Sequence, residues 1–162
     1  MNTTLVYPVD LSTDPGGRTL ARVPDLVGCV TDGADALEAL AEVADALEEA
    51  LCAAMVCKED IPTPSEANGR PTVTPSPELA AKIALYREIK AQGLSNVMVA
   101  RMAGTDEKAI RRLLDPAKGG KIASIQRVLS ALGRRLVIGV EDIGPQRRPS
   151  LADHPSFLQG AE

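Results

Sequence analysis

Residues 94–114 constrain this chain most, because their pattern predicts two short helices joined by a tight turn. Ser95 suits the N-cap of the first helix, since its hydroxyl can accept a hydrogen bond from a free backbone N–H. Gly104 stands where that helix must end, in the left-handed conformation that glycine adopts at little cost. Thr105 is then expected to cap the second helix. The apolar stripe of the first helix is expected to comprise Val97, Val99, Ala100 and Met102.

The second predicted helix has an apolar inner side and a basic outer side. Asp106 and Glu107 fall in its first turn, where the helix dipole favours acidic groups. The inner side is expected to comprise Ala109, Ile110, Leu113 and Leu114. The basic outer side is Lys108, Arg111 and Arg112. Because many repressors place such a helix in the DNA major groove, we predict a DNA-binding helix-turn-helix. The alternative is two packed helices with a solvated basic face.

The net charge of −4 conceals two oppositely charged parts. Residues 1–75 hold 13 acidic and four basic residues, whereas residues 76–148 hold 14 basic and seven acidic ones. An acidic module attracts cationic proteins and repels nucleic acid, and a basic module does the opposite. The charge distribution therefore predicts two modules with different partners.

The overall composition is that of a globular protein, with 44% hydrophobic and 25% charged residues in a chain of 162. Aromatic residues make up only 2%, so the cores must be built from Leu, Val, Ile and Ala. No apolar run approaches about 18 residues and no signal peptide is evident, which predicts a cytoplasmic protein without a membrane partner. Cys29, Cys52 and Cys57 lack zinc spacing, and we expect them to be buried, unreactive thiols in a reducing compartment.

The first module is predicted to contain three strands followed by one long helix. The strands are expected at residues 5–11, 18–23 and 29–31, with a turn at residues 14–17. The helix is expected at residues 34–58, with Asp32 or Asp35 as its N-cap. Its apolar seam, which would lie across one face of a small antiparallel sheet, is Leu37, Leu40, Ala44, Leu47, Leu51 and Ala54.

The rest of this helix surface is acidic, and no basic residue falls between Asp32 and Val56. Its acidic residues are Asp35, Glu38, Glu42, Asp45, Glu48 and Glu49. Plain solvation would explain such a face on an isolated helix. Six acids without an intervening base favour a cationic protein partner instead.

Residues 59–77 carry five prolines and are predicted to form a linker or long loop, with a short edge strand at 71–74. Further helices are expected at 78–92, with Leu79, Ile83, Tyr86 and Ile89 buried, and at 122–131. The loop at 115–120 would bring Lys118 and Lys121 to the DNA backbone. A strand is expected at 136–140, and since it has no obvious partner in the chain, its pairing with a second copy is a hypothesis. These features divide the chain into modules at 1–75 and 76–143 and a disordered tail at 144–162.

The residues needed for common enzyme chemistry are missing. The one histidine, His154, lies in the predicted tail, so no Ser–His or Cys–His pair is available and no catalytic residue is predicted. No glycine-rich phosphate loop and no zinc spacing occur, so neither cofactor nor metal is expected. Asp10 and Asp14 could be imagined as a metal site of a nuclease-like sheet, but no partners stand at fixed spacing around them.

Several segments of the first module resemble the HicB antitoxin family. The most specific is Pro24-Asp25-Leu26-Val27-Gly28-Cys29-Val30-Thr31-Asp32-Gly33, which lies between Tyr7-Pro8-Val9 and an Ala- and Glu-rich helix followed by Ile61-Pro62-Thr63-Pro64-Ser65. The stretch Asp106–Pro116 is similar to the Cro/repressor-type helix-turn-helix attached to many HicB proteins. Val27 departs from the proline common at its position, and Ala34 from a small polar residue.

The resemblance implies an α+β chain, with a β-β-β-α-β domain related to a degraded ribonuclease H core before an all-α helix-turn-helix domain. It implies binding to a HicA-type toxin, a small basic RNA-cleaving protein whose catalytic histidine would be masked. It also implies repression of the promoter of the pair, by a homodimer or homotetramer on double-stranded operator DNA. Within the second module we predict DNA contacts from Asn96, Lys108, Arg111, Arg112, Lys118 and Lys121. The alternatives are a transcription regulator with a small-molecule-sensing first module and a ribonuclease H-like enzyme.

Overall fold

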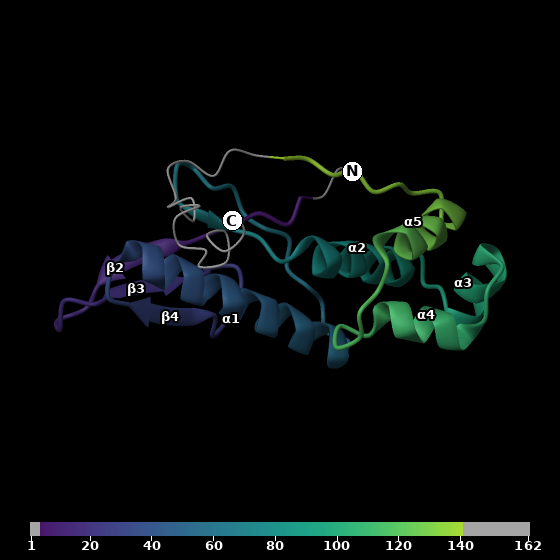
Figure 1. Cartoon of the computed structure of the whole chain (residues 1–162), viewed down its shortest axis with the longest axis horizontal. Coiled ribbons are helices and arrows are strands. Elements are labelled where there is room, and N and C mark those ends of the chain that lie inside the picture. The colour runs from purple at the N-terminus through teal and green to yellow at the C-terminus, as the bar shows by residue number, and fades with distance from the viewer. Residues whose placement is uncertain (1–3, 141–162) are drawn as a thin grey trace, which may run out of the picture.

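The computed structural model describes residues 4–140 and is of the α+β class, as predicted. Strands and one long helix form one end of the molecule, and four further helices form the other (Figure 1). The strands are β1 (Tyr7–Pro8), β2 (Asp10–Thr13), β3 (Thr19–Arg22), β4 (Val30–Gly33) and β5 (Thr72–Val73). The helices are α1 (Ala36–Val56), α2 (Pro77–Ala91), α3 (Asn96–Ala103), α4 (Glu107–Leu114) and α5 (Ile122–Ala131). The predicted tail at 144–162, with His154, lies outside the described residues.

The strands form two small antiparallel sheets, one ordered β2-β3-β4 and the other pairing β1 with β5. The prediction of one strand at 5–11 was therefore wrong, since that segment contributes to both sheets. Pro8 has no N–H to donate, and the next residue, Val9, donates its own N–H to the Pro71 carbonyl at 2.8 Å. The chain then passes into the other sheet at Asp10. The expected short strand at 71–74 is present as β5, and the strand expected at 29–31 ends two residues later, at Gly33.

The long helix α1 packs across β3 and β4, as the apolar seam predicted, with Asp35 rather than Asp32 as its N-cap. At its start the buried side differs from the prediction. Leu37 is 49% exposed, whereas Ala39 and Val43 are fully buried. The reason is a close approach between helix and sheet, because a Cβ on Gly33 would stand 2.4 Å from the backbone nitrogen of Ala39. A small side chain of α1 must therefore face β4 there.

We expect Gly33→Ala to destabilise the chain by about 1–3 kcal/mol, because the new methyl group would overlap backbone atoms that cannot rotate away. Denaturant unfolding followed by circular dichroism measures this loss. Gly119→Ala is the matched control, since a Cβ there meets no atom within 4 Å and Gly119 has no positive φ. Equal stability of the two variants would contradict the packing described for β4 and α1.

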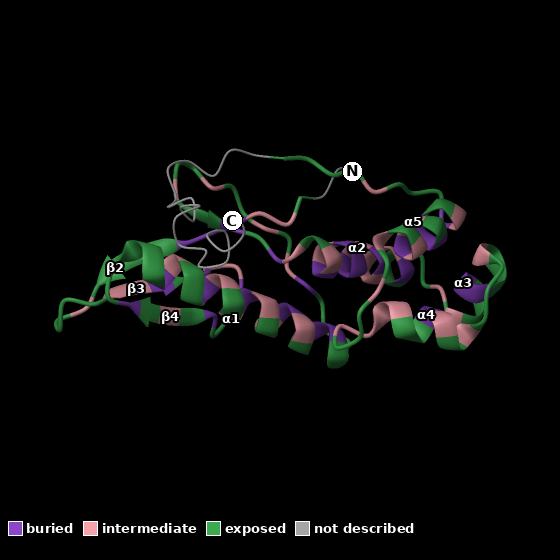
Figure 2. Ribbon diagram, viewed as in Figure 1, coloured by how far each residue is buried: buried purple, intermediate pink, exposed green. Residues whose placement is uncertain are grey.

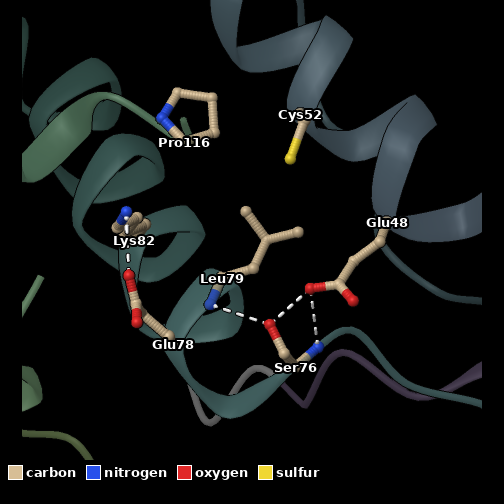
Figure 3. Close-up of a pocket in the computed structure, with 7 residues that line it drawn as sticks. All are labelled: Glu48, Cys52, Ser76, Glu78, Leu79, Lys82 and Pro116. Carbon is tan, nitrogen blue, oxygen red and sulfur yellow. Dashed lines mark hydrogen bonds and ion pairs between the residues drawn. The ribbon is translucent and has the colours of Figure 1, made fainter. Parts of the chain in front are cut away.

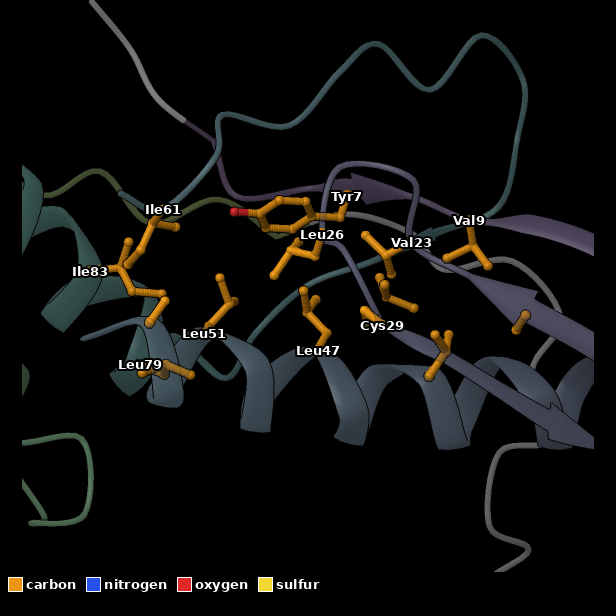
Figure 4. Packing of buried hydrophobic residues seen from close by; sticks show 14 of the residues in the cluster. Tyr7, Val9, Val23, Leu26, Cys29, Leu47, Leu51, Ile61, Leu79 and Ile83 are labelled. Carbon is orange, nitrogen blue, oxygen red and sulfur yellow. The ribbon is translucent and has the colours of Figure 1, made fainter. Parts of the chain in front are cut away.

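The apolar core of this end lies between α1, the sheets and the loop before β5 (Figure 4). Tyr7 is fully buried, and its hydroxyl donates a hydrogen bond to the Pro62 carbonyl at 2.9 Å. Asp25 accepts hydrogen bonds from the backbone and the hydroxyl of Ser65, at 2.9 and 3.1 Å. The segments 24–33 and 61–65, distant in sequence, therefore contact each other and fix the loop over the core.

Helix α2 connects the two ends, because opposite sides of it enter two different apolar clusters. Leu79 and Ile83 join the core around α1 (Figure 4), whereas Leu85 and Ile89 pack against α3–α5. The sequence prediction placed Leu79, Ile83 and Ile89 correctly on the buried side. It placed Tyr86 there as well, and this residue is half-buried. Figure 2 shows the resulting band of buried residues along α2.

The two short helices joined by a tight turn are present as α3 and α4. Ser95 caps α3, and Gly104 ends it with a φ of +63°, as predicted. The cap of α4 was mispredicted, because the side chain of Asp106, not Thr105, accepts the hydrogen bond from the Ala109 N–H, at 2.8 Å. The predicted apolar stripe of α3 is also only partly correct. Val99 and Ala100 are buried, but Val97 and Met102 are 44% and 49% exposed.

The C-terminal part of the described chain and the cysteines agree only partly with the predictions. Helix α5 forms where expected, but residues 136–140 form no strand within the described chain, because no neighbouring strand is there to accept their backbone hydrogen bonds. Cys29 is buried as expected and Cys52 is half-buried, whereas Cys57 is exposed because it lies at the C-terminal end of α1. Among the described residues, no helix combines the length and apolar character needed to cross a bilayer.

Candidate nucleic-acid interface and acidic helix face

The basic outer side predicted for α4 is exposed. Lys108, Arg111 and Arg112 are all accessible, while Ile110 on the opposite side is fully buried and anchors the helix. The guanidinium of Arg111 lies 3.7 Å from the Glu107 carboxylate, and its side chain remains 64% exposed. An exposed pair of this kind contributes little to stability, so the arginine is free to exchange Glu107 for another anion.

The structure brings Arg112 and Lys121 to one cleft of about 630 Å³ between α4 and the start of α5. Its walls also include the Gly104–Thr105 turn, the Gly119–Gly120 backbone and Arg127. Arg127 is exposed and was not predicted as a site residue. It lies a full turn inside α5, and only the packing of α5 against α2 and α3 brings it to the cleft that Arg112 also lines. Three cations at one cleft make this surface suited to a polyanion.

The remaining predicted DNA contacts lie outside this cleft. Lys118 is exposed on the loop after α4, and Asn96 is half-buried at the first position of α3. Lys108 and Arg111 lie on α4 but do not line the cleft. Because α3 packs against α4, all six predicted residues belong to one helical end of the molecule.

The six acidic residues of α1 do not form a uniform face. Asp35 caps the helix and accepts a hydrogen bond from the Glu38 N–H at 2.9 Å, while Glu38 in turn bonds to the Ala34 N–H. These two residues therefore cap the start of α1 in a pattern similar to a capping box, with the return hydrogen bond one residue before the N-cap. Glu48 is half-buried and accepts hydrogen bonds from the hydroxyl and N–H of Ser76, the N-cap of α2. It joins the two ends of the molecule.

Glu42, Asp45 and Glu49 are the exposed remainder of the acidic set. They form no ion pair with any residue between 4 and 140. Their spacing of three and four residues places them along one side of α1. The structure thus reduces six equivalent candidates to three that are free to meet a cationic partner.

The two carboxylates that could be imagined as a nuclease-like metal site each bind another group of the chain. Asp10 pairs with Arg70 at 3.0 Å, and Asp14 accepts the Arg18 N–H at 2.9 Å, which closes the β2-β3 hairpin. Within residues 4–140, no three His, Cys, Asp or Glu side chains gather in an arrangement that could hold a metal ion.

Curated relatives match this chain over most of its length. Antitoxin HicB 2 of Photorhabdus laumondii is 33% identical over 136 residues, which are 84% of this chain and 96% of the relative. The chain belongs to the HicB antitoxin family. Antitoxin HicB of Pseudomonas fluorescens is 31% identical over 139 residues, 83% of this chain and 93% of the relative. Antitoxin HicB of Escherichia coli K12 is 29% identical over 131 residues, 80% and 95% of the two chains. No protein-family model matches the chain.

Membership confirms the resemblance drawn from the motifs in residues 24–33 and 61–65. Each match covers more of this HicB-family antitoxin than either charged part alone, so the similarity extends into both parts of the chain. Antitoxins are regulatory proteins rather than enzymes, in agreement with the prediction of a non-catalytic chain.

Proposed function

We propose that this HicB-family antitoxin neutralises a HicA-type, RNA-cleaving toxin through its first module and represses its own operon through its second. The modules are residues 1–75, with a HicB-like fold related to a degraded ribonuclease H core, and residues 76–143, a helix-turn-helix DNA-binding domain. The observation that carries the proposal is the opposite charge of two exposed surfaces on one chain. The acids are Glu42, Asp45 and Glu49 on α1, and the bases surround α4.

The proposed DNA contacts divide into base-reading and backbone-binding groups. Lys108, Arg111 and Arg112 protrude from α4, the second helix of the unit, which in repressors of this kind reaches base edges in the major groove. Arginine bound to guanine is the commonest specific pairing, worth about 1–3 kcal/mol. Asn96, Lys118 and Lys121 flank α4 and are assigned to phosphates, which fix the position of the protein along the duplex. Arg127 joins them from the cleft wall.

The proposed toxin contact rests on charge and shape. The exposed acids of α1 would cover a cationic RNA-binding surface, and charge of this kind accelerates the encounter of two proteins more than it tightens the final complex. The exposed side chains of β2 and the exposed Val27 and Val30 supply further contact area in the same module. Binding would keep RNA from the catalytic histidine of the toxin.

Co-expression with the product of the neighbouring reading frame tests the proposal directly. That frame is expected to encode a basic protein with one essential histidine. We expect induction of the neighbour alone to arrest growth and the full antitoxin to restore it. Arrest that the full chain cannot relieve would contradict toxin binding, and failure of the chain to shift its own promoter DNA would contradict repression.

We also propose that the chain binds DNA as a homodimer or homotetramer, because operators read by such domains are two-fold symmetric. The apolar side chains of Val137, Ile138 and Val140 are 73%, 72% and 98% exposed, which makes residues 136–140 a candidate for contact with a second copy. Light scattering after size exclusion should give two or four times the chain mass of 17.0 kDa. Val137→Asp with Ile138→Asp should lower that mass, and an unchanged mass would exclude this segment from the interface.

A further inference from the structure

Lys82 on α2 is the one charged side chain that is buried among residues 4–140, at 1% exposure. Its ammonium group donates hydrogen bonds to the Asp115 carbonyl at 3.0 Å and to the Lys118 carbonyl. It also lies 3.1 Å from the Glu78 carboxylate, a pair that Figure 3 shows. Three acceptors thus match the three donors of an ammonium group. A buried charge is tolerated when it is paired and fully hydrogen-bonded, and this one is.

Both carbonyls belong to the loop that follows α4. The same Glu78 oxygen accepts a hydrogen bond from the Gly120 N–H at 2.9 Å, so α2 holds the loop near both of its ends. These two hydrogen bonds, with that from Lys82 the larger cause, lower the pKa of the Glu78 carboxyl and keep it ionised. The Gly120 Cα also packs closely on Lys82, since a Cβ there would be 3.4 Å from its Cε.

The loop carries two of the cations assigned to operator phosphates, Lys118 within it and Lys121 directly after it. The intervening Gly119 and Gly120 leave its backbone with more conformational freedom than other residues would. A free loop of this kind would lose that freedom on binding DNA and would bind more weakly for it. Because Lys82 and Glu78 on α2 already hold the loop in one conformation, less backbone freedom remains to be lost when DNA binds.

We propose that Lys82 is a positioning residue for operator binding, which holds the loop at 115–120 so that Lys118 and Lys121 meet the DNA backbone together. The proposal rests on the DNA-binding function proposed above. Lys82 itself, being buried, does not touch the DNA. Its effect on affinity must therefore depend on the cations that the loop carries. If Lys82 only stabilised the fold, its loss would reduce affinity equally whether or not those cations were present.

A double-mutant cycle separates these two roles. We expect Lys82→Met in the full chain to weaken binding to its own promoter DNA roughly 10- to 100-fold. The slope of log affinity against log salt should also become shallower, by the amount that the loss of about one to two phosphate contacts would cause. In a background with Lys118→Ala and Lys121→Ala, the same change should cost less than about twofold, because the cations it positions are gone. An equal loss in both backgrounds, or no loss in the first, would overturn the proposal.

Three further measurements keep the outcome decisive. Lys90→Met is the matched control, the same change on the same helix at an exposed lysine that pairs with Asp60, and should leave affinity unchanged. If Lys82→Met fails to fold by circular dichroism, Glu78→Ala replaces it, because Glu78 is 43% exposed and alanine leaves no acceptor for the Gly120 N–H of the same loop. Wild-type protein that does not bind its promoter would overturn the proposed function. Wild-type binding with undiminished binding by the folded variant would overturn only the role of Lys82.

Discussion

The double variant Arg111→Ala with Arg112→Ala should lose binding to operator DNA and keep binding to the toxin. Both side chains protrude from α4, and neither contributes to the apolar core that Ile110 anchors. If each makes one good contact with a base, its loss costs about 1–3 kcal/mol. Two such losses weaken binding at least roughly 30-fold, which fluorescence anisotropy with labelled promoter DNA can measure.

The control for this variant removes the same charge elsewhere. Lys58→Gln with Arg135→Gln neutralises two exposed cations that lie outside α4 and the cleft, and it should change affinity only slightly. Equal losses in the two double variants would mean that net charge alone drives DNA binding. Loss of toxin binding together with DNA binding would instead mean that the arginines support the fold.

The second large effect is expected on the acidic face of α1. Glu42→Lys with Glu49→Lys reverses two exposed charges on one side of the helix and should slow association with the toxin by roughly tenfold or more at low salt. The difference from wild type should shrink as salt is added, since exposed charges are screened. Lysine is a good helix former, so α1 should remain intact. Stopped-flow mixing with a catalytically inactive toxin would give the rate.

Glu59→Lys with Glu66→Lys is the matched control, because both residues are exposed acids of the same module that lie in the loop after α1. We expect it to slow association less. If the two pairs have the same effect, the toxin responds to the net charge of the module and α1 is not its docking face. If neither has an effect, the contact lies elsewhere, for example at the exposed strand β2.

Local chemistry was sufficient to predict the elements with strong short-range signals. Ser95 and Gly104 delimit α3 through a side-chain cap and a left-handed residue, and both are properties of single positions. The hairpin turn at residues 14–17 and the presence of the amphipathic helix α1 were also predictable from residues close together in the sequence. Thr105 shows the limit, because Thr105 and Asp106 are adjacent and both are good caps, and the backbone path chooses between them.

Predictions that depended on distant neighbours were less accurate. Leu37 has the right spacing for the α1 seam, but the contact between Gly33 and Ala39 turns it outward. Residues 5–11 have the composition of one strand, yet their partners, β3 and β5, lie in different sheets. Residues 136–140 have the composition of a strand and no partner within the described chain, so composition alone was not enough.

The amino-acid sequence by itself determined the two charged modules, the paired short helices, the basic side of α4 and the family to which the chain belongs. The paired helices and the basic side of α4 follow from residues one helical turn apart, and the charged modules and the family follow from the order of residues along the chain. Only the tertiary structure decided which acids of α1 are free, that Arg127 lines the same cleft as Arg112, and that Lys82 holds the loop after α4. The physical reason is that these hydrogen bonds and contacts join residues that are distant in the sequence, and only folding brings them together. Lys82, for example, is 33 and 36 positions away from its two carbonyl partners.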